Sequence, residues 1–362
     1  MSRRLVDVLV VSPGVTMGLR ASAEELADSL RALGCTVRVL FLWKDTSWAT
    51  PGWLPNAAGE LFVSAALRWK TSRVLRETEV TAFIYGTSIA TILQPRRRLA
   101  RAAVRIDKPA SVNRPGIRNL PQRWLERRQL SRACMLLPFS RVGADDLRAY
   151  YRVPVIPLPP LVRPGKPIEP RVRRAVCYAA NPEKKGLDLI VKGFAAARED
   201  DVELLVAGVD EQKGRDFLLR HRIQVPAWVR WCGPLESEAY RRLVASSTVF
   251  ISAARREEYG VALLEALADG ALLVAMPTAW PIEPIELARA LDPLLAPKAR
   301  SVEALSASIR AALCYSETER AAYALRAGEL LKPYSAASRQ TRLRDEILPT
   351  LLGTRPQALR AA

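Results

Sequence analysis

Residues 256–270 read REEYGVALLEALADG, a helical pattern that is opened by a glycine and preceded by an apolar, strand-like run. If the helix begins just after Gly260, its first backbone N–H groups have no partner within the helix and point out of its end. Such groups, together with the helix dipole, form an anion site of the kind that holds a diphosphate. The predicted donors are the N–H groups of Val261, Ala262 and Leu263.

Two carboxylates flank this predicted anion site. Glu257 lies in the loop before the helix, and Glu265 lies about 6 Å further along the helix axis, at 1.5 Å per residue. Carboxylates in these positions can accept hydrogen bonds from hydroxyls at the two ends of a sugar nucleotide. On spacing alone, an alternative is that both are ordinary surface carboxylates.

The first 160 residues alternate apolar runs with helix-like segments, which predicts a parallel sheet covered by helices. A helix is expected to begin at Ser22, since Glu25 would complete a capping box, and to stop at Gly34. Gly14 lies in the loop after the first run, where open α/β sheets bind ligands. The runs lie at 5–11, 36–42, 81–85, 102–106 and 134–138.

A second series of apolar runs follows a proline-rich stretch. Seven prolines lie between 154 and 170, a density that neither a helix nor a central strand tolerates, so a domain linker is predicted there. Strands are then expected at 175–179, 202–207, 229–231, 248–252 and 272–275, and helices near 187–197, 237–245 and 261–268. The predicted organisation is a basic Rossmann-like domain at 1–160, a linker at 161–170, a second Rossmann-like domain at 171–334, a helix at 335–352 and a frayed tail at 353–362.

Positive charge is concentrated in the first predicted domain. The chain has a net charge of +18, and residues 1–160 hold 25 Lys and Arg against 12 Asp and Glu. Residues 96–132 alone hold 12 basic residues against two acidic ones. Such a field favours an anionic partner, such as phospholipid headgroups, nucleic acid or a phosphorylated acceptor. A solvated, arginine-rich surface would explain the charge by itself equally well.

Composition excludes several classes of protein. Five cysteines without a CxxC pair suggest neither a zinc site nor a disulfide framework, and one histidine, His221, cannot build a His-rich metal site. His221 lies between two arginines, which predicts an exposed helix position rather than a catalytic role. No apolar run reaches about 18 residues, and Asp7 interrupts the stretch that a signal peptide would need. We therefore expect a cytoplasmic protein, with peripheral membrane association left open.

The Glu-x7-Glu spacing of residues 257–265, with Tyr-Gly and Leu-Leu between, resembles the family-4 retaining glycosyltransferases of the GT-B fold. Residues 181–188, NPEKKGLD, look like the Glu-Lys-Gly turn of that family, and residues 231–235 and 270–274 are similar to its next conserved elements. The resemblance covers about 175–295. It implies two Rossmann-like domains that face each other across a cleft, with a C-terminal helix crossing back to the first domain.

The resemblance also implies a reaction and a set of residues. A sugar would move from a nucleotide-diphosphate donor to an acceptor hydroxyl with retention, with no metal or other cofactor required. The candidate catalytic residues are Asp107, Lys185 and Glu257. The candidate donor-binding residues are Gly14, Lys184, Lys185, Glu257, Gly260, Val261, Ala262, Leu263 and Glu265. The sequence departs from the family in three places. It lacks the usual arginine before the Lys-Gly turn, and it lacks the usual histidine of the first domain, for which Asp107 is the best replacement. Where the family often has two glycines near the sugar it has Trp280, which either narrows the donor pocket or is buried packing.

The acceptor is expected to be anionic or carried on an anionic surface. The candidate acceptor-binding residues are Arg105, Asp107, Asn113 and Arg114. The candidate contacts to the anionic surface are Arg96, Arg97, Arg98 and Arg101. Three alternatives stay open: a lipid-linked or polysaccharide-precursor acceptor at membrane headgroups, a hydroxymethylated base modified by a phage-type DNA glycosyltransferase, and a non-catalytic nucleotide-sugar binder. The oligomeric state is not predicted.

Overall fold

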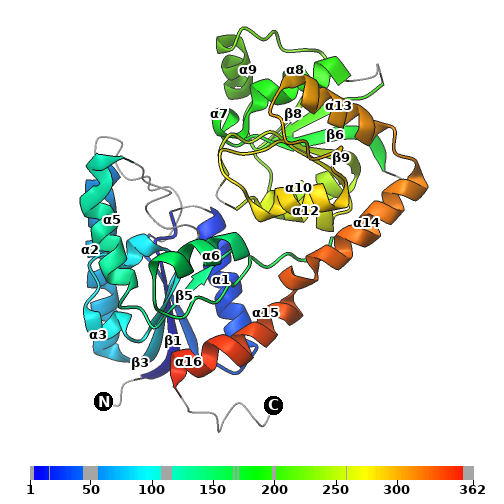
Figure 1. Ribbon diagram of the computed structural model, residues 1–362. Helices are drawn as coiled ribbons and strands as arrows, with labels where there is room; N and C mark the ends of the chain where they lie inside the picture. Colours follow the sequence, from blue (N-terminus) through cyan, green and yellow to red (C-terminus); the bar gives the residue numbers. More distant parts are fainter. Residues whose placement is uncertain are drawn as a thin grey trace. The chain divides into compact units, whose positions relative to one another are not determined.

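A computed structural model describes residues 4–15, 17–43, 56–106, 116–165, 168, 171–197, 201–257 and 259–353 of the chain. The chain divides into two compact units, of which unit 1 comprises residues 1–161 with 336–362, and unit 2 comprises residues 162–335. Each unit is built on a five-stranded parallel sheet with helices packed against it (Figure 1). The α/β architecture with two Rossmann-like sheets, as expected from the sequence, is therefore confirmed.

The sheet of unit 1 has the strand order β2-β1-β3-β4-β5. Its strands are β1 (Arg4–Ser12), β2 (Val37–Phe41), β3 (Thr78–Tyr85), β4 (Ala102–Ile106) and β5 (Met135–Pro138). Each strand coincides with one of the five predicted apolar runs. Both faces of the sheet are buried, because alternate residues of β1 enter two different core clusters, Leu9 on one face and Val8 and Val10 on the other.

Helices cover both faces of this sheet. They are α1 (Met17–Arg31), α2 (Asn56–Glu77), α3 (Arg96–Leu99), α5 (Leu120–Leu130) and α6 (Arg141–Tyr150), with the 3-10 turns η1 (Ser88–Thr91) and η2 (Ile117–Asn119). The capping box predicted at Ser22 is wrong, because α1 already begins at Met17 and Ser22 lies inside it. The predicted stop is present, since Gly34 follows α1 with a φ of +83° that favours glycine.

The chain returns to unit 1 at its C-terminal end. The predicted helix at 335–352 is interrupted, because α15 (Ala336–Arg342) leads into a π-helical segment (Leu343–Ile347) and then α16 (Leu348–Leu352). Four apolar side chains of this return segment join the core cluster that contains Val8 and Val10 of β1. They are Leu343, Ile347, Leu348 and Leu351. Except for Gly353, the predicted frayed tail lies outside the described residues.

The sheet of unit 2 has the strand order β10-β9-β6-β7-β8. Its strands are β6 (Val172–Tyr178), β7 (Leu204–Ala207), β8 (Val229–Gly233), β9 (Ser247–Ser252) and β10 (Leu272–Ala275). Its helices are α7 (Pro182–Lys185), α8 (Leu187–Ala197), α9 (Glu211–Arg220), α10 (Ser237–Ala245), α11 (Val261–Ala268), α12 (Glu283–Leu291), α13 (Val302–Leu313) and α14 (Glu317–Leu331), with the turn η3 (Lys332–Tyr334). The helices predicted near 187–197, 237–245 and 261–268 are confirmed as α8, α10 and α11.

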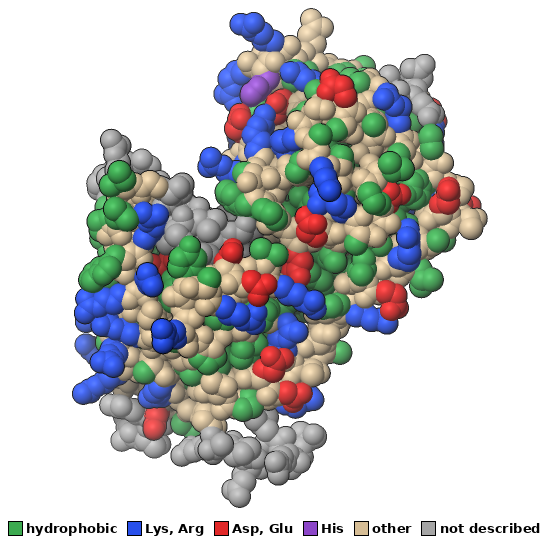
Figure 2. All heavy atoms as spheres, viewed as in Figure 1, with side chains coloured by type: hydrophobic (Ala, Val, Ile, Leu, Met, Phe, Trp, Pro, Cys, Tyr) green, Lys and Arg blue, Asp and Glu red, His purple; other side chains and the backbone are tan. Residues whose placement is uncertain are grey.

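None of the helices in the described parts of the chain is both long and apolar enough to cross a bilayer. Basic side chains gather on the side of unit 1 that carries α3 and the last turns of α2 (Figure 2). The positive charge that the sequence places in its first half is therefore displayed on the surface of unit 1.

Candidate active site

The helix predicted to open an anion site begins where the sequence indicated. Gly260 precedes α11 with a φ of +87°, and a Cβ atom there would lie 3.1 Å from the side chain of Ile282. A left-handed backbone conformation next to a close neighbour requires glycine. One predicted donor is already used, because the N–H of Leu263 donates to the carbonyl of Gly260 at 3.0 Å. Val261 and Ala262 are left as the two first-turn N–H donors.

The turn that carries Lys185 is built around a short helix. The Asn181 side chain accepts a hydrogen bond from the Lys184 N–H at 2.9 Å and so caps α7. Gly186 ends the helix with a φ of +68°, and a Cβ atom at this position would lie only 2.1 Å from the carbonyl oxygen of Ala253. The Lys-Gly part of the sequence motif is therefore needed for close contact between α7 and the loop after β9.

Lys185 and Glu257 form an ion pair between Lys185 Nζ and Glu257 Oε2. Their side chains are only 18% and 11% exposed, so the pair lies in a partly dehydrated site where charge interactions are stronger than at the surface. The two residues are 72 positions apart in the sequence. The structure thus brings together the two candidates that the resemblance singled out in unit 2.

Tyr178, the last residue of β6, lies beside this pair. Lys185 Nζ is 5.6 Å from the centre of the Tyr178 ring, which is within the range of a cation–π contact. Burial raises the pKa of Tyr178, and the charges of Glu265 and Glu257 raise it further. Both motif carboxylates therefore act on one ring at the carboxyl end of a central strand, where parallel α/β sheets place their ligands.

Glu265 faces a second ion-pair network. Arg241 Nη1 lies 3.9 Å from Glu265 Oε1, while the same guanidinium donates to both oxygens of Asp269 at 2.5 and 2.7 Å. Asp269 is almost fully buried at the end of α11. The bidentate Arg241–Asp269 pair fixes the guanidinium, so Glu265 is held from the side of α10.

Trp280 shapes the loop that carries Glu257. Its Nε1–H donates to the backbone carbonyl of Glu257 at 2.8 Å. The sequence left open whether Trp280 narrows the donor pocket or only packs. The structure shows that it fixes the backbone of a candidate catalytic residue.

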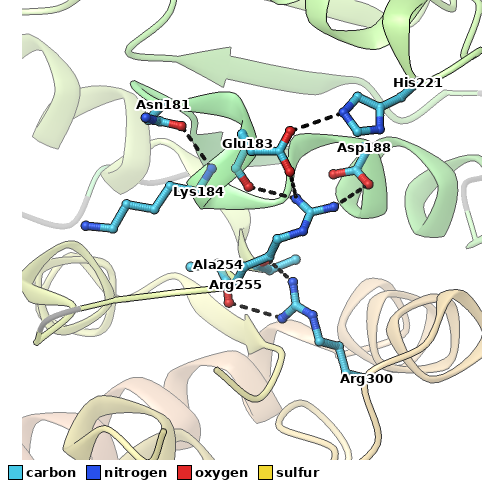
Figure 3. Close-up of polar contacts among 9 residues, drawn as sticks. Asn181, Glu183, Lys184, Asp188, His221, Ala254, Arg255 and Arg300 are labelled. Carbon is cyan, nitrogen blue, oxygen red and sulfur yellow. Dashed lines mark hydrogen bonds and ion pairs between the residues drawn. The ribbon is translucent and has the colours of Figure 1, made fainter. Parts of the chain in front are cut away.

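Arg255 clamps the α7 turn from the loop after β9 (Figure 3). Its Nη2 donates to Asp188 Oδ2 at 2.7 Å and its Nη1 to the carbonyl of Glu183 at 2.7 Å, while its backbone N–H donates to the carbonyl of Lys184 at 2.8 Å. Burial alone would raise the pKa of Asp188, but the hydrogen bond and charge of Arg255 outweigh it and hold the pKa below its ordinary value. Sequence reasoning missed Arg255, although it directly precedes the quoted motif.

Arg300 supports the same loop from below. Its guanidinium donates to the carbonyls of Ala253, Ala254 and Pro277 at 2.5, 3.1 and 2.8 Å. Burial lowers the pKa of Arg300, and the positive charge of Arg255 lowers it further. Two arginines therefore fix the backbone on which the α7 turn rests.

His221 lies closer to the site than its sequence position suggested. It ends α9 with a partly exposed ring, in keeping with the predicted helix surface, but its Nε2 lies 3.2 Å from Glu183 Oε2 (Figure 3). Glu183 belongs to the α7 turn. The Lys184 side chain points away from this cluster (Figure 3). The histidine therefore contacts the support of the Lys-Gly turn, and its lack of a catalytic role stays a prediction.

The candidates of unit 1 are placed only in part. Asp107, Asn113 and Arg114 lie outside the described residues. Gly14 lies in the loop after β1 with a φ of +66°. Arg105 is buried; its Nη1 donates to Ser22 Oγ at 2.7 Å, and its guanidinium lies 4.1 Å from the centre of the Phe139 ring. Arg105 therefore ties β4 to α1, and an acceptor contact by this residue stays a prediction.

The four arginines proposed for an anionic surface differ in their surroundings. Arg96 and Arg97 are exposed. Arg98 donates to Gln94 Oε1 at 3.1 Å and to Ser72 Oγ at 2.8 Å, and Arg101 donates to the carbonyl of Thr81 at 2.7 Å. Arg98 and Arg101 thus donate hydrogen bonds to unit 1 itself, although Arg101 is exposed like Arg96 and Arg97.

The segment that carries this site matches a known family. Residues 173–314 match the family model described as Glycosyl transferases group 1, a span that contains Lys185, Glu257 and Glu265. The chain has the GT-B fold. Sequence comparison with the curated proteins gives no match. The family match and the fold support a glycosyltransferase.

Solved structures resemble the chain over almost its whole length. WaaG, a glycosyltransferase involved in lipopolysaccharide biosynthesis, has a TM-score of 0.63 and 15% identity, with 95% of this chain and 97% of that one covered. OtsA has a TM-score of 0.68 and 13% identity over 94% and 99% of the two chains. The trehalose 6-phosphate synthase from Burkholderia multivorans has a TM-score of 0.65 and 14% identity over 94% and 97%. At these identities, the likeness establishes the GT-B fold.

Proposed function

We propose that the protein transfers a sugar from a nucleotide-diphosphate donor to an acceptor hydroxyl with retention of anomeric configuration, as family-4 glycosyltransferases do. The observation that carries this proposal is the Lys185–Glu257 ion pair, which lies in the segment that matches the glycosyltransferase model and just before the start of α11. Related folds were solved with UDP in TarM and in the pneumococcal GtfA, which supports a nucleotide-linked donor.

The reaction requires charge stabilisation at the leaving diphosphate. Negative charge grows on that group as the bond to the sugar breaks, and the Lys185 ammonium and the N–H groups of Val261 and Ala262 are the cationic and dipolar partners that the site offers. Glu257 holds Lys185 in place and, as a carboxylate, accepts hydrogen bonds from a sugar hydroxyl. Glu265, held by Arg241, is the candidate partner of the ribose hydroxyls.

The ion pair also explains why neither charge needs to be exposed before the donor binds. An unpaired buried ammonium would be costly, but Glu257 compensates it in the donor-free protein. When a diphosphate arrives, Lys185 gains a second anionic partner without moving into a new environment. The ammonium is therefore already in place before the donor binds. Such pre-organised charge is expected where a sugar is transferred and a strongly anionic diphosphate leaves.

The first experiment tests donor binding by calorimetry with a panel of UDP-, GDP- and ADP-sugars. Lys185→Met and Glu257→Gln should each weaken binding of the preferred donor, because each removes a charge-assisted contact worth roughly 1.5–3 kcal/mol. The matched controls are Lys213→Met and Glu238→Gln on exposed helix surfaces of the same unit. Unchanged affinity in both site variants, or equal losses in the controls, would contradict the site assignment.

The second experiment follows the anomeric configuration by proton NMR during slow hydrolysis or transfer of the preferred donor. Retention gives first a product with the configuration of the donor. An inverted first product would contradict the retaining mechanism while leaving glycosyl transfer in place. Binding of the donor without hydrolysis or transfer to any acceptor supplied would instead indicate a non-catalytic nucleotide-sugar binder.

A further inference from the structure

Helix α2 presents an unusual apolar strip to the solvent. Its inward side chains, among them Val63 and Leu67, belong to the core of unit 1. Its exposed positions from 61 to 69 follow helical spacing and are apolar except for Arg68. The exposed large side chains of this strip are Leu61, Phe62 and Trp69, and the indole of Trp69 is 62% exposed. An ordinary solvated helix face would carry polar residues here.

The turn η2 and helix α5 repeat this arrangement. Glu126 and Leu130 are buried, whereas the outward positions Ile117, Leu120 and Trp124 are apolar and follow one another at i, i+3 and i+7. Ile117 is 83% exposed and Trp124 is 61% exposed. Two separate segments of unit 1 therefore expose aliphatic and tryptophan side chains along their outer faces.

The two strips form one surface. Gln122 of α5 donates a hydrogen bond to Glu60 of α2, which joins the apolar halves of the two helices. The turn η1 also packs against both helices. In Figure 2, hydrophobic side chains gather on the upper left of unit 1, where Figure 1 shows α2 and α5, and basic side chains gather just below them. We call this surface, formed by the outer positions of α2, η2, α5 and α3, the α2–α5 face.

The second half of each strip is basic. After the apolar positions, the outward residues become arginine in both helices, and α3 adds two more. The guanidinium of Arg128 lies 5.3 Å from the centre of the Trp124 ring, so cation and indole share the surface. Among the acids of these helices, Glu60 and Glu126 accept hydrogen bonds from Gln122 and Ser88, and Glu77 at the end of α2 is exposed. The exposed arginines of α2, α3 and α5 are Arg68, Arg73, Arg76, Arg96, Arg97, Arg127 and Arg128.

We propose that the α2–α5 face docks onto an anionic lipid bilayer. Tryptophan with aliphatic neighbours suits the boundary between headgroups and acyl chains, where the ring is buried and its N–H stays among polar groups. The arginines lie beside this apolar part and pair with lipid phosphates. A helix that lies in the interface plane buries one apolar face and directs its basic groups to the headgroups, as α2 and α5 can do together.

Other occupants fit this surface less well. A second copy of the chain would bring two arginine clusters together, which opposes self-association through the same face. Duplex DNA would neutralise the arginines but would leave Phe62, Ile117 and Leu120 without an apolar partner. Of these three occupants, only an anionic bilayer offers partners to both the exposed apolar groups and the basic groups.

The inference rests on the proposed function in one respect, since a bilayer would present a lipid-linked acceptor to the enzyme. Bilayer binding is measured without any sugar transfer, so the two can fail separately. The full chain is floated with vesicles of phosphatidylcholine alone or mixed with phosphatidylglycerol. We expect binding only to the mixed vesicles and a blue shift of tryptophan fluorescence on binding.

Two pairs of substitutions separate the apolar from the basic contribution. Trp69→Ala with Trp124→Ala should lower the partition coefficient at least tenfold, whereas Trp69→Phe with Trp124→Phe should retain most of the binding and lose the blue shift. Arg127→Gln with Arg128→Gln should lower it about fivefold per arginine and flatten its salt dependence. The matched controls in unit 2 are Leu294→Ala with Leu325→Ala and Arg220→Gln with Arg326→Gln, all at exposed positions.

Several results would overturn the inference. One is equal loss of binding in the control and face variants. Another is salt-dependent binding of the parent to duplex DNA with no binding to anionic vesicles. A third is a dimer in solution that becomes monomeric when Trp69 and Trp124 are replaced, because the face would then be an interface between copies. Intact donor affinity in the face variants would show that unit 2 is folded, and an unfolding curve like that of the parent would show that unit 1 is folded too, so that the loss of vesicle binding is specific.

Discussion

Replacing Arg255 with Met tests whether the clamp on the α7 turn serves the donor site or only the stability of unit 2. The change keeps an unbranched stem but removes the guanidinium and with it two hydrogen bonds from a charged group, to Asp188 and to the carbonyl of Glu183. Such bonds contribute about 1.5–3 kcal/mol each when buried. Because the Arg255 side chain is 36% exposed, solvent screens them, and we expect a total loss of stability of about 2 kcal/mol.

Arg255→Met should also lower the affinity for the donor, because the α7 turn becomes less ordered in the donor-free protein. Without the clamp, the turn that carries Lys185 keeps the Asn181 cap and the bond to the backbone N–H of residue 255, but it loses the guanidinium that ties it to Asp188. Restoring the order of one residue when the donor binds costs about 1–2 kcal/mol of conformational entropy. We therefore expect the affinity for the nucleotide sugar to fall about 5- to 30-fold.

Calorimetry with the preferred donor and chemical denaturation measure the two effects on the same variants. In a Lys185→Met background, Arg255→Met should change donor affinity little, because the turn then has no ammonium to position. Arg173→Met is the control, since Arg173 pairs with Asp201 at the surface of the same unit. A loss of stability with unchanged donor affinity would refute the positioning role, and equal affinity losses in both Lys185 backgrounds would show that Arg255 acts independently of Lys185.

Three further outcomes are expected. Gly186→Ala should lower the free energy of unfolding by at least about 1–3 kcal/mol, because φ is +68° and the added Cβ meets the Ala253 carbonyl; an unchanged unfolding curve would contradict the described turn. Asp188→Asn should destabilise the protein at pH 7. The native pKa of Asp188 lies below its ordinary 3.8, so its carboxylate stabilises the fold above about pH 4. This contribution is lost as the pH falls through the native pKa. Urea titrations of parent and variant should therefore converge in acid. His221→Ala should leave turnover unchanged and cost less than about 1 kcal/mol in thermal unfolding, since its contact with Glu183 is partly exposed; a large loss of turnover with normal folding would place His221 in the reaction.

The strands and several helices could be predicted because their signals are local. Continuous apolar runs such as Val8–Val11 mark strands that are buried on both faces, and Gly34 and Gly260 mark helix ends at positive φ. Ser22 shows where local signals fail. Its pattern is that of a cap, but its hydroxyl accepts a hydrogen bond from Arg105, which is 83 residues away in the sequence. A partner at that distance is invisible to a four-residue motif.

The candidate site shows the same limit. Motif spacing indicated Lys185, Glu257 and the helix start at Gly260, which the structure brings to one end of the unit 2 sheet. The clamp by Arg255 could not be predicted, because it depends on how the loop after β9 meets α7, a tertiary contact set by Gly186 and Ala253. The sequence lacks the usual arginine before the Lys-Gly turn, and an arginine reaches this turn instead from 70 residues downstream of Lys185.

The return of the chain to unit 1 determines the order in which the units can be completed during synthesis. Unit 2 is continuous from 162 to 335, so all its residues have been made before the last helices of unit 1 exist. Until residues 343–351 emerge, the sheet face around Val8, Val10, Ala82 and Ile84 is covered only in part, by side chains of α1 such as Leu26 and Leu30. The nascent first half therefore exposes the remaining part of this apolar face, and a fragment that ends at 335 would keep that part exposed. A self-sufficient unit 1 requires both of its segments, which a circular permutation that joins them through a short linker would supply.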